Sequence, residues 1–204
     1  NVETLATIPA IMENGADWYL GLGTEDAPGT KIFTLSGDLE TPGYCEVEFG
    51  TTIRDLIYRF GGGVRNGEAL QAVLIGGAAG TFVDDSVLDT PTGYTSFKEI
   101  GAVIGSGAVI VLSEKSSLPN MLHSILRFFK HESCGKCVPC REGLRQMLNV
   151  LTNITEGRGN EGDIELLEEL SETAIGASLC ALGTSAPNPF LSTLRYFKDE
   201  YEAH

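Results

Sequence analysis

Three cysteines stand at every third position in the stretch "ESCGKCVPCREG", which covers residues 132–143. They are Cys134, Cys137 and Cys140, and a fourth, Cys180, follows 40 positions later in "SLCALG". Thiolates spaced in this way can converge on one centre, because the first three share one short segment of chain. The pattern indicates metal or iron–sulfur chemistry.

Two occupants of such a site compete. A four-cysteine zinc site usually takes its ligands as two separated C-x2-C pairs, whereas the division here is three plus one. A [4Fe-4S] cube offers a separate iron corner to each thiol, and the C-x2-C-x2-C run is typical of it. The spacing favours a [4Fe-4S] cluster that carries electrons, since four cysteine ligands leave no open coordination position. Zinc and a redox-active thiol pair in "CVPC" remain as alternatives.

Composition narrows the class of protein. The chain has 204 residues, with 14 Lys and Arg against 28 Asp and Glu, so its net charge of -14 argues against nucleic acid or anionic lipid as a partner. No apolar run approaches the roughly 20 residues that span a bilayer, which predicts no direct membrane insertion. Five cysteines, three of them clustered, favour a reducing compartment and predict a cytoplasmic protein. Cys45, outside the cluster, is interpreted as a small buried hydrophobe.

The order of expected strands and helices in the first half predicts an α+β domain. Residues 1–30 contain one short helical pattern and a turn-rich stretch, which we interpret as a connector. Residues 31–115 contain short β-rich segments bounded by glycine, with one amphipathic helix, "TTIRDLIYRFGGG", between the second and the third. A β-grasp sheet folded over a single helix is the simplest closure of that order. The expected strands lie in "KIFTLSG", "CEVEFG", "LQAVLIGG" and "AVIVLS".

Residues 116–204 are predicted to form a four-helix bundle. Four amphipathic segments follow one another with short loops, and their apolar stripes are expected to form the core. Both cysteine segments then fall between helices, so they can meet at one end of the bundle. Lys136 and Arg141 are the candidate cations beside the negative charge of the thiolates, and His123 is expected to be a surface or boundary residue.

The cysteine blocks, in combination with several upstream blocks, resemble a known family. "NVETLATIPAIMENGADWYL", "GTKIFTLSGDLETPG", "EVEFGTTIRDLI" and "GAVIGSGAVIVLSE" precede "ESCGKCVPCREG" and "SLCALG" in the family order. The chain resembles the carboxy-terminal part of the NADH-binding flavoprotein subunits. These include the subunit of respiratory NADH:quinone oxidoreductase (complex I) and the diaphorase subunits of soluble NAD-linked hydrogenases and formate dehydrogenases.

The resemblance implies cofactors and site residues. The intact family subunit combines an FMN and NAD(H) binding domain, a soluble-ligand-binding β-grasp domain and a helical bundle with one [4Fe-4S] cluster. Carried over residue by residue, the four clustered cysteines would be the cluster ligands. Asn1 and Thr4 match the end of a family stretch, "NNVET", whose Asn and Thr touch the flavin. "GGAAGT" at 76–81 departs from the Gly-Gly-x-Ser-Gly-Gly loop of many members and is interpreted as a β-turn.

The resemblance also implies a function and partners. The family's flavin-phosphate loop and its acidic nicotinamide contacts have no counterpart here, so the chain is expected to be a fragment with no catalytic residue of its own and no activity towards NADH. Its expected role is to pass single electrons from FMN through the cluster.

The tail "TSAPNPFLSTLRYFKDEYEAH" resembles the soluble hydrogenase and formate dehydrogenase relatives more than complex I, which stays an alternative. The expected partners are a thioredoxin-like [2Fe-2S] subunit and a multi-cluster subunit. A zinc-stapled, non-redox interaction module is the alternative of another class.

Overall fold

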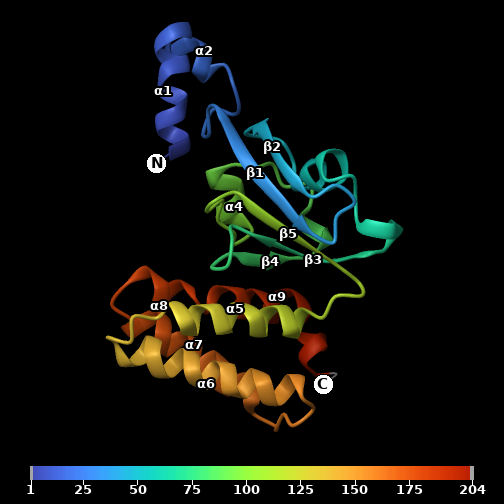
Figure 1. Cartoon of the computed structure of the whole chain (residues 1–204), viewed down its shortest axis with the longest axis vertical. Coiled ribbons are helices and arrows are strands. Elements are labelled where there is room, and N and C mark those ends of the chain that lie inside the picture. Colours follow the sequence, from blue (N-terminus) through green and yellow to red (C-terminus); the bar gives the residue numbers. More distant parts are fainter. Residues whose placement is uncertain (1, 203–204) are drawn as a thin grey trace.

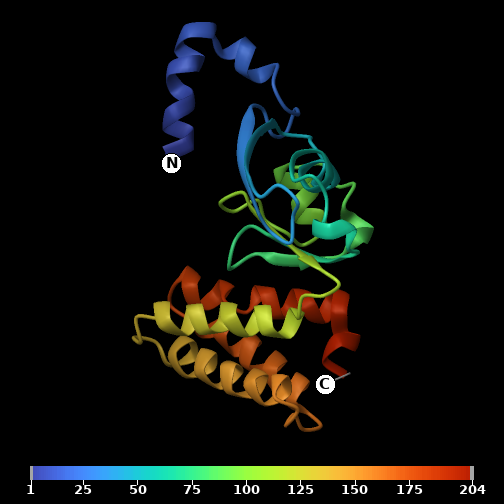
Figure 2. The ribbon, with the colours of Figure 1, turned by 45° about the vertical axis from the view of Figure 1, so that its right-hand side comes forward.

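The structure is a computed structural model that describes residues 2–202, apart from the side chains of residues 198–200 and 202. It is a mixed α/β fold in which a five-stranded sheet lies over a layer of helices, while two amino-terminal helices extend away from the sheet (Figures 1 and 2). No helix within the described residues is both long enough and apolar enough to cross a membrane.

The strands form one sheet in the order β2-β1-β5-β3-β4. β1 pairs antiparallel with β2 and parallel with β5, and β3 pairs antiparallel with both β5 and β4. Four of these strands confirm the predicted segments. The fifth, β4, was not predicted, because three residues after a glycine-rich turn are too few to show an alternating pattern. The bounds are β1 Thr30–Gly37, β2 Gly43–Glu48, β3 Leu70–Ile75, β4 Thr81–Val83 and β5 Ala108–Ser113.

Alternate residues of β3 face two different cores. Val73 and Ile75 belong to a cluster on the face covered by the crossover helix, and Ala72 and Leu74 belong to a cluster shared with the carboxy-terminal helices. Successive side chains of a strand point to opposite faces, so a strand buried on both sides loses the polar alternation of an exposed one. Burial on both faces therefore explains why the sequence of β3 is almost continuously apolar.

The connection from β2 to β3 begins as the predicted helix and then widens. Thr52 caps it, its hydroxyl accepting a hydrogen bond from the N–H of Asp55 at 3.0 Å. After the single α-turn of α3, Ile53–Asp55, the chain continues as a π-turn over Leu56–Phe60. The N–H of Gly61 donates to the carbonyl of Leu56, five residues back, at 3.0 Å, and ends the helix there. The remaining short helices above the sheet are 3-10 turns at Arg65–Gly67 and Asp85–Val87 and the helix α4, Tyr94–Glu99.

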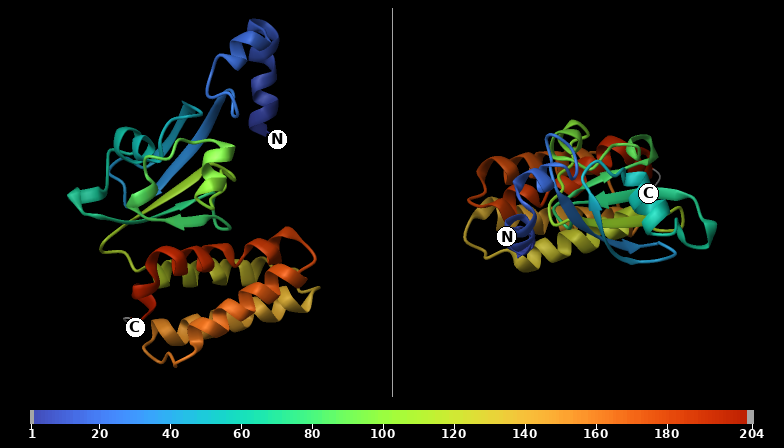
Figure 3. Two further views of the ribbon diagram at one scale, coloured as in Figure 1. Left: turned by 180° about the vertical axis from the view of Figure 1, so that it is seen from behind. Right: turned by 90° about the horizontal axis from the view of Figure 1, so that it is seen from above.

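Four long helices, within the described residues, build the carboxy-terminal layer. α5 and α9 lie next to the sheet, and α6 and α7 lie on their far side (Figures 1 and 3). Their apolar stripes meet in one cluster with the lower face of the sheet. The bounds are α5 Leu118–Glu132, α6 Val138–Thr155, α7 Asp163–Ala177, the short α8 Ala181–Ser185 and α9 Asn188–Glu202. α8 was not predicted, because its five residues are too few to show a helical period.

The sheet and the helical layer are joined at β4. The N–H of Phe82 donates to Ser192 Oγ on α9 at 2.8 Å, and Asn188 Nδ2 reaches the carbonyl of Ala79 at 3.4 Å. Residues 76–80 of the glycine-rich segment thus form a turn that contacts α9, in agreement with the β-turn interpretation, and Thr81 begins β4.

A second joint links β1 to the start of α5. Asp38 follows β1 and its carboxylate accepts hydrogen bonds from the N–H of Ser113 at 3.0 Å, the hydroxyl of Ser116 at 2.5 Å and the guanidinium of Arg65 at 2.9 Å. The hydrogen bond from Ser113, and next that from Ser116, lowers the pKa of Asp38. The charged carboxylate therefore stabilises the segment that leads into α5.

The sign of this pKa shift gives a test. A lowered folded-state pKa means that the stabilisation is fully present above the ordinary carboxyl pKa of about 3.9 and is lost as the pH falls through the folded-state value. Asp38→Asn is expected to reduce the free energy of unfolding by about 2 kcal/mol at neutral pH. In urea titrations, the difference from the wild type should persist down to about pH 4 and shrink below it. Asp17→Asn, at an exposed position of α2, is the control and should stay within about 0.5 kcal/mol of the wild type at neutral pH. A pH-independent loss in Asp38→Asn would contradict the assignment.

Candidate metal centre

Two helix starts carry the four cysteines of the predicted site. α5 ends at Glu132, and a tight turn leads to Cys137, which is the residue before α6. Cys134 lies in that turn, and Cys140 is the third residue of α6. Cys180 directly precedes α8. Pro139 fits in the first turn of α6, because the N–H that proline lacks has no helical partner there.

Both cysteine segments lie at the same end of the helical layer, opposite the loop between α6 and α7 (Figures 1 and 2). Gly183, in α8, touches the other segment: a Cβ added there would come within 3.0 Å of the Cβ of Cys140 and 2.4 Å of Ser178 Oγ. The N–H of Leu179 hydrogen-bonds the thiol of Cys137. The chain therefore brings the two distant segments into direct contact, as the sequence predicted.

The thiols differ in their surroundings. Cys140 is buried, 4% exposed, and burial is the main cause that raises its pKa; the negative charges of the other three thiolates, those of Cys137, Cys180 and Cys134, raise it further. The hydrogen bond from Leu179 is the main cause that lowers the pKa of Cys137. The four sulfur atoms therefore lie within range of one another's charges.

The donor set fits an iron–sulfur cluster. Four thiolates are offered at one end of the helices, two of them exposed, one half-buried and one buried. A [4Fe-4S] cube binds one thiolate at each of four separate iron corners. Within residues 2–202, no three side chains among His, Cys, Asp and Glu lie close enough together to hold a single metal ion. Cys45 lies apart on β2, half-buried, and burial raises its pKa.

The cations near the site have separate roles. Arg141 donates to the carbonyl of Gly135 at 2.5 Å and pairs with Glu142 at 3.2 Å, so it braces the turn that carries Cys134. Lys136 is exposed and forms no ion pair with any described residue. His123 Nε2 lies 3.1 Å from Thr152 Oγ1 between α5 and α6, which agrees with its prediction as a boundary residue.

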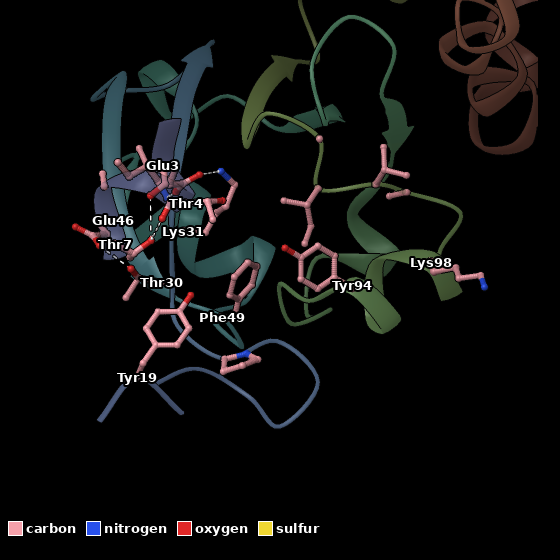
Figure 4. A pocket seen from close by; sticks show the side chains of 17 residues that line it. Glu3, Thr4, Thr7, Tyr19, Thr30, Lys31, Glu46, Phe49, Tyr94 and Lys98 are labelled. Atoms are coloured by element: carbon pink, nitrogen blue, oxygen red, sulfur yellow. Dashed lines mark hydrogen bonds and ion pairs between the residues drawn. The ribbon is translucent and has the colours of Figure 1, made fainter. Parts of the chain in front are cut away.

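The predicted flavin contacts lie at the other end of the chain. Asn1 falls outside the described residues. Thr4 is exposed on the first turn of α1, Val2–Asn14, and lines a cavity of about 830 Å³ between that helix, the sheet and α4 (Figure 4). Its hydroxyl forms no hydrogen bond with the described residues.

Sequence reasoning missed the residue that holds α1 in place. Glu3 pairs with Lys31 and accepts a hydrogen bond from the N–H of Ile32 at 2.7 Å, where β1 extends beyond the start of β5 (Figure 4). Burial is the largest single influence on the pKa of Glu3 and raises it, but the hydrogen bond from Ile32 and the pairing with Lys31 together lower it below its ordinary value. The second helix, α2 (Ala16–Leu20), continues the same protruding arm. The sequence contained no signal for the pairing, because Glu3 and Lys31 are separated by two helices and a turn.

A family model matches the part of the chain that carries the cysteines. Its description is "NADH-ubiquinone oxidoreductase-F iron-sulfur binding region", and it matches residues 120–204. Residues 120–204 are therefore similar to that iron–sulfur binding region. The match includes all four cysteines of the candidate site.

Relatives extend the similarity to the whole chain. It is 42% identical to the NADP-reducing hydrogenase subunit HndC of Solidesulfovibrio fructosivorans and 38% identical to an NADH-quinone oxidoreductase subunit of Mycobacterium tuberculosis (strain ATCC 25618 / H37Rv), in both cases over 204 residues. A chain in the crystal structure of an NAD+-reducing [NiFe]-hydrogenase in the H2-reduced state is similar over all of this chain, with a TM-score of 0.89 and 34% identity. The resemblance predicted from the motifs is thereby confirmed.

The chain spans less than half of these relatives. It covers 42% of the hydrogenase subunit, 46% of the NADH-quinone oxidoreductase subunit and 34% of the chain in the crystal structure. By their names, the relatives are subunits of oxidoreductases. The iron–sulfur binding region is accordingly part of a longer architecture in the relatives.

Proposed function

We propose that this chain is the electron-transfer part of an NADH-dependent FMN and iron–sulfur oxidoreductase subunit. Cys134, Cys137, Cys140 and Cys180 are proposed to hold one [4Fe-4S] cluster. The observation that supports the proposal is that the two segments carrying these cysteines meet at one end of the helical layer, inside the iron–sulfur binding region. When bound, the cluster supplies a one-electron carrier between a two-electron donor and one-electron acceptors.

The proposed domains follow the predicted boundaries. Residues 1–30 are a connector and a remnant of the flavin-binding domain, residues 31–115 a β-grasp domain and residues 116–204 a helical bundle. The strand order is β2-β1-β5-β3-β4, and β1 and β5, the first and last strands along the chain, are parallel neighbours. This order, together with the helical crossover, supports the β-grasp assignment. The contacts of α5 with α6 and α9, and of α7 with α6 and α9, support a bundle of four helices.

The placement of α1 supports a flavin beside the cluster. The start of α1 and the loop between α5 and α6 lie on the same side of the molecule in every view (Figures 1, 2 and 3). Thr4, one of the two proposed FMN contacts, belongs to that first turn, and the other, Asn1, lies outside the described residues. Glu3 fixes the turn to β1, so the arm presents Thr4 at a defined position.

The context within the family stays a proposal. A soluble, cytoplasmic hydrogenase or formate dehydrogenase complex with NAD(H) as the electron donor is the function that we favour, and complex I is the alternative. The hydrogenase subunit is 42% identical to the chain, whereas the NADH-quinone oxidoreductase subunits of Mycobacterium tuberculosis and Escherichia coli (strain K12) are 38% and 36% identical.

The surface beside the cysteines suits an acidic partner. Residues 118–145 contain five Lys and Arg and two Asp and Glu, against 14 and 28 in the whole chain. Arg127, Lys130 and His131 are exposed around Phe128, whose side chain is 48% exposed, on the last turns of α5 before the cysteine loop. A basic patch with an exposed aromatic side chain is typical of a protein-binding surface. We propose that a partner subunit, of the [2Fe-2S] or multi-cluster kind, docks here.

Charge reversal tests the docking surface. Arg127→Glu with Lys130→Glu is expected to slow association with the purified partner subunit about tenfold at low salt, and the difference should shrink at high salt because screening weakens both proteins' fields. Stopped-flow or surface-binding kinetics would measure it. Arg158→Glu, in the loop at the opposite end of the helical layer, is the control for each single reversal, Arg127→Glu or Lys130→Glu, and should bind at the wild-type rate. Equal effects of both variants would argue for a general charge effect instead of a docking site.

A redox titration tests the electron-transfer role. Anaerobically reconstituted chain should accept one electron from photoreduced flavin and return it to an added acceptor, with bleaching and recovery of its visible absorption. A protein that binds iron but takes up no electron reversibly would have a structural cluster. A protein that binds one zinc and no iron would support the zinc-stapled interaction module.

A further inference from the structure

Two serine hydroxyls lie against the cysteine sulfurs, one from each cysteine segment. Ser133 follows α5, and its Oγ lies 3.2 Å from Cys140 Sγ. The N–H of Gly135 donates to the same oxygen at 3.3 Å. Between a thiol and a hydroxyl either group could donate. A cluster-bound thiolate carries no hydrogen, so the hydroxyl of Ser133 would then be the donor to Cys140 Sγ.

Ser178 supplies the second hydroxyl. Its Oγ is buried without a hydrogen-bond partner of normal geometry among the described residues, and it lies beside the thiol of Cys137. Gly183 packs directly on it, since a Cβ at that position would come within 2.4 Å of the oxygen. α8 therefore closes this hydroxyl off from water. A buried hydroxyl without a hydrogen-bond partner lowers the stability of the fold by about 1–3 kcal/mol. A cysteine sulfur that accepts a hydrogen bond from Ser178 would remove this cost.

Such hydrogen bonds act on the redox properties of a cluster. Adding an electron increases the negative charge on the sulfur atoms, so a donor to sulfur stabilises the reduced state more than the oxidised state. A backbone donor, such as the N–H of Leu179 at Cys137, has the same effect but is independent of side-chain type. A serine hydroxyl also contributes to the reduction potential, and substitution of the serine can remove that contribution.

We propose that Ser133 and Ser178 donate hydrogen bonds to the sulfur atoms of Cys140 and Cys137 and thereby raise the reduction potential of the cluster. This inference rests on the proposed function, in which the four cysteines bind the cluster. The two serines are positioning residues for the thiolates and are not ligands. They set how readily the chain accepts an electron from its donor.

The test is a potentiometric titration of the full chain with dithionite as reductant, followed by paramagnetic resonance. Ser133→Ala and Ser178→Ala are each expected to lower the ratio of reduced to oxidised protein at a fixed potential by about three- to tenfold. A tenfold change corresponds to about 59 mV for one electron. The double variant should show the product of the two changes, since the serines act on different thiolates.

Matched variants separate a hydrogen bond from a change in packing. Ser133→Thr keeps a hydroxyl and should retain the wild-type potential. Ser124→Ala removes a hydroxyl that donates to the carbonyl of Asn120 at 3.1 Å, away from the cysteines, and should change nothing. Iron content identifies any variant that fails to assemble.

A second measurement uses the wild-type protein and Ser133→Ala, and needs no substitution of the buried Ser178. Exchange of the wild-type protein into deuterated water should shift the iron–thiolate stretching bands in resonance Raman spectra, and Ser133→Ala should lose part of that shift. Full iron content with wild-type potentials and spectra in both alanine variants would overturn the inference alone. Wild-type protein that binds no iron would overturn the proposed function and this inference with it.

Discussion

Cys180→Ala is expected to abolish the [4Fe-4S] centre and to lower bound iron well below the wild-type value of about four per chain. Cys180 precedes α8 and is the ligand from the second cysteine segment, so no neighbouring residue of the first segment can replace it. Without it, one iron corner has no protein thiolate. Iron and acid-labile sulfide analysis, together with paramagnetic resonance of the reduced protein, would measure the loss.

Cys45→Ala is the matched control. This half-buried cysteine lies on β2, opposite Phe33 of β1, and is separate from the helical layer. Its removal should leave iron, sulfide and the resonance signal unchanged. Equal iron in the Cys180 variant and the wild type would contradict the ligand assignment.

Gly80→Ala is expected to have the largest effect on stability. A Cβ at Gly80 would lie 1.9 Å from the carbonyl oxygen of Ile75, so the turn between β3 and β4 would have to move. That turn contacts α9 through Ala79 and Asn188, and movement there would disturb the joint between sheet and helices. We expect a loss of about 3 kcal/mol in the free energy of unfolding, which lowers the melting temperature by about 6–12 °C in a protein of this size.

Gly43→Ala serves as the comparison, because it places a methyl group on the same sheet with no atom within 4 Å. Thermal and urea unfolding should find this variant within about 0.5 kcal/mol of the wild type. If Gly80→Ala were equally neutral, the turn would not be packed as the structure has it.

Spacing was sufficient to predict that the two cysteine segments meet at one end of the helices, and it predicted most of the elements around them. The C-x2-C-x2-C run fixes three thiols in one short segment, and the amphipathic stripes of the helices imply that Cys180 returns to the same end. Period-two and helical patterns likewise predicted β1, β2, β3 and β5 and the long helices, because each buries a regular face.

The details that shape the site lie in contacts that no local pattern encodes. Gly183 allows α8 to lie on Ser178 and Cys140, yet α8 is too short to show a helical period. The pairing of Glu3 with Lys31 depends on the path of α2 and the following turn. The π-turn after α3 arises from the bond between Gly61 and Leu56, and a helical hydrophobic pattern does not distinguish it from an α-turn.

The most direct test of the central claim is the metal content and oxidation behaviour of the wild-type chain purified and reconstituted without oxygen. We predict about four irons and four sulfides per chain and a paramagnetic signal that appears on reduction by one electron. One zinc with no iron, or iron that remains bound after Cys134, Cys137, Cys140 and Cys180 are all replaced by alanine, would contradict it.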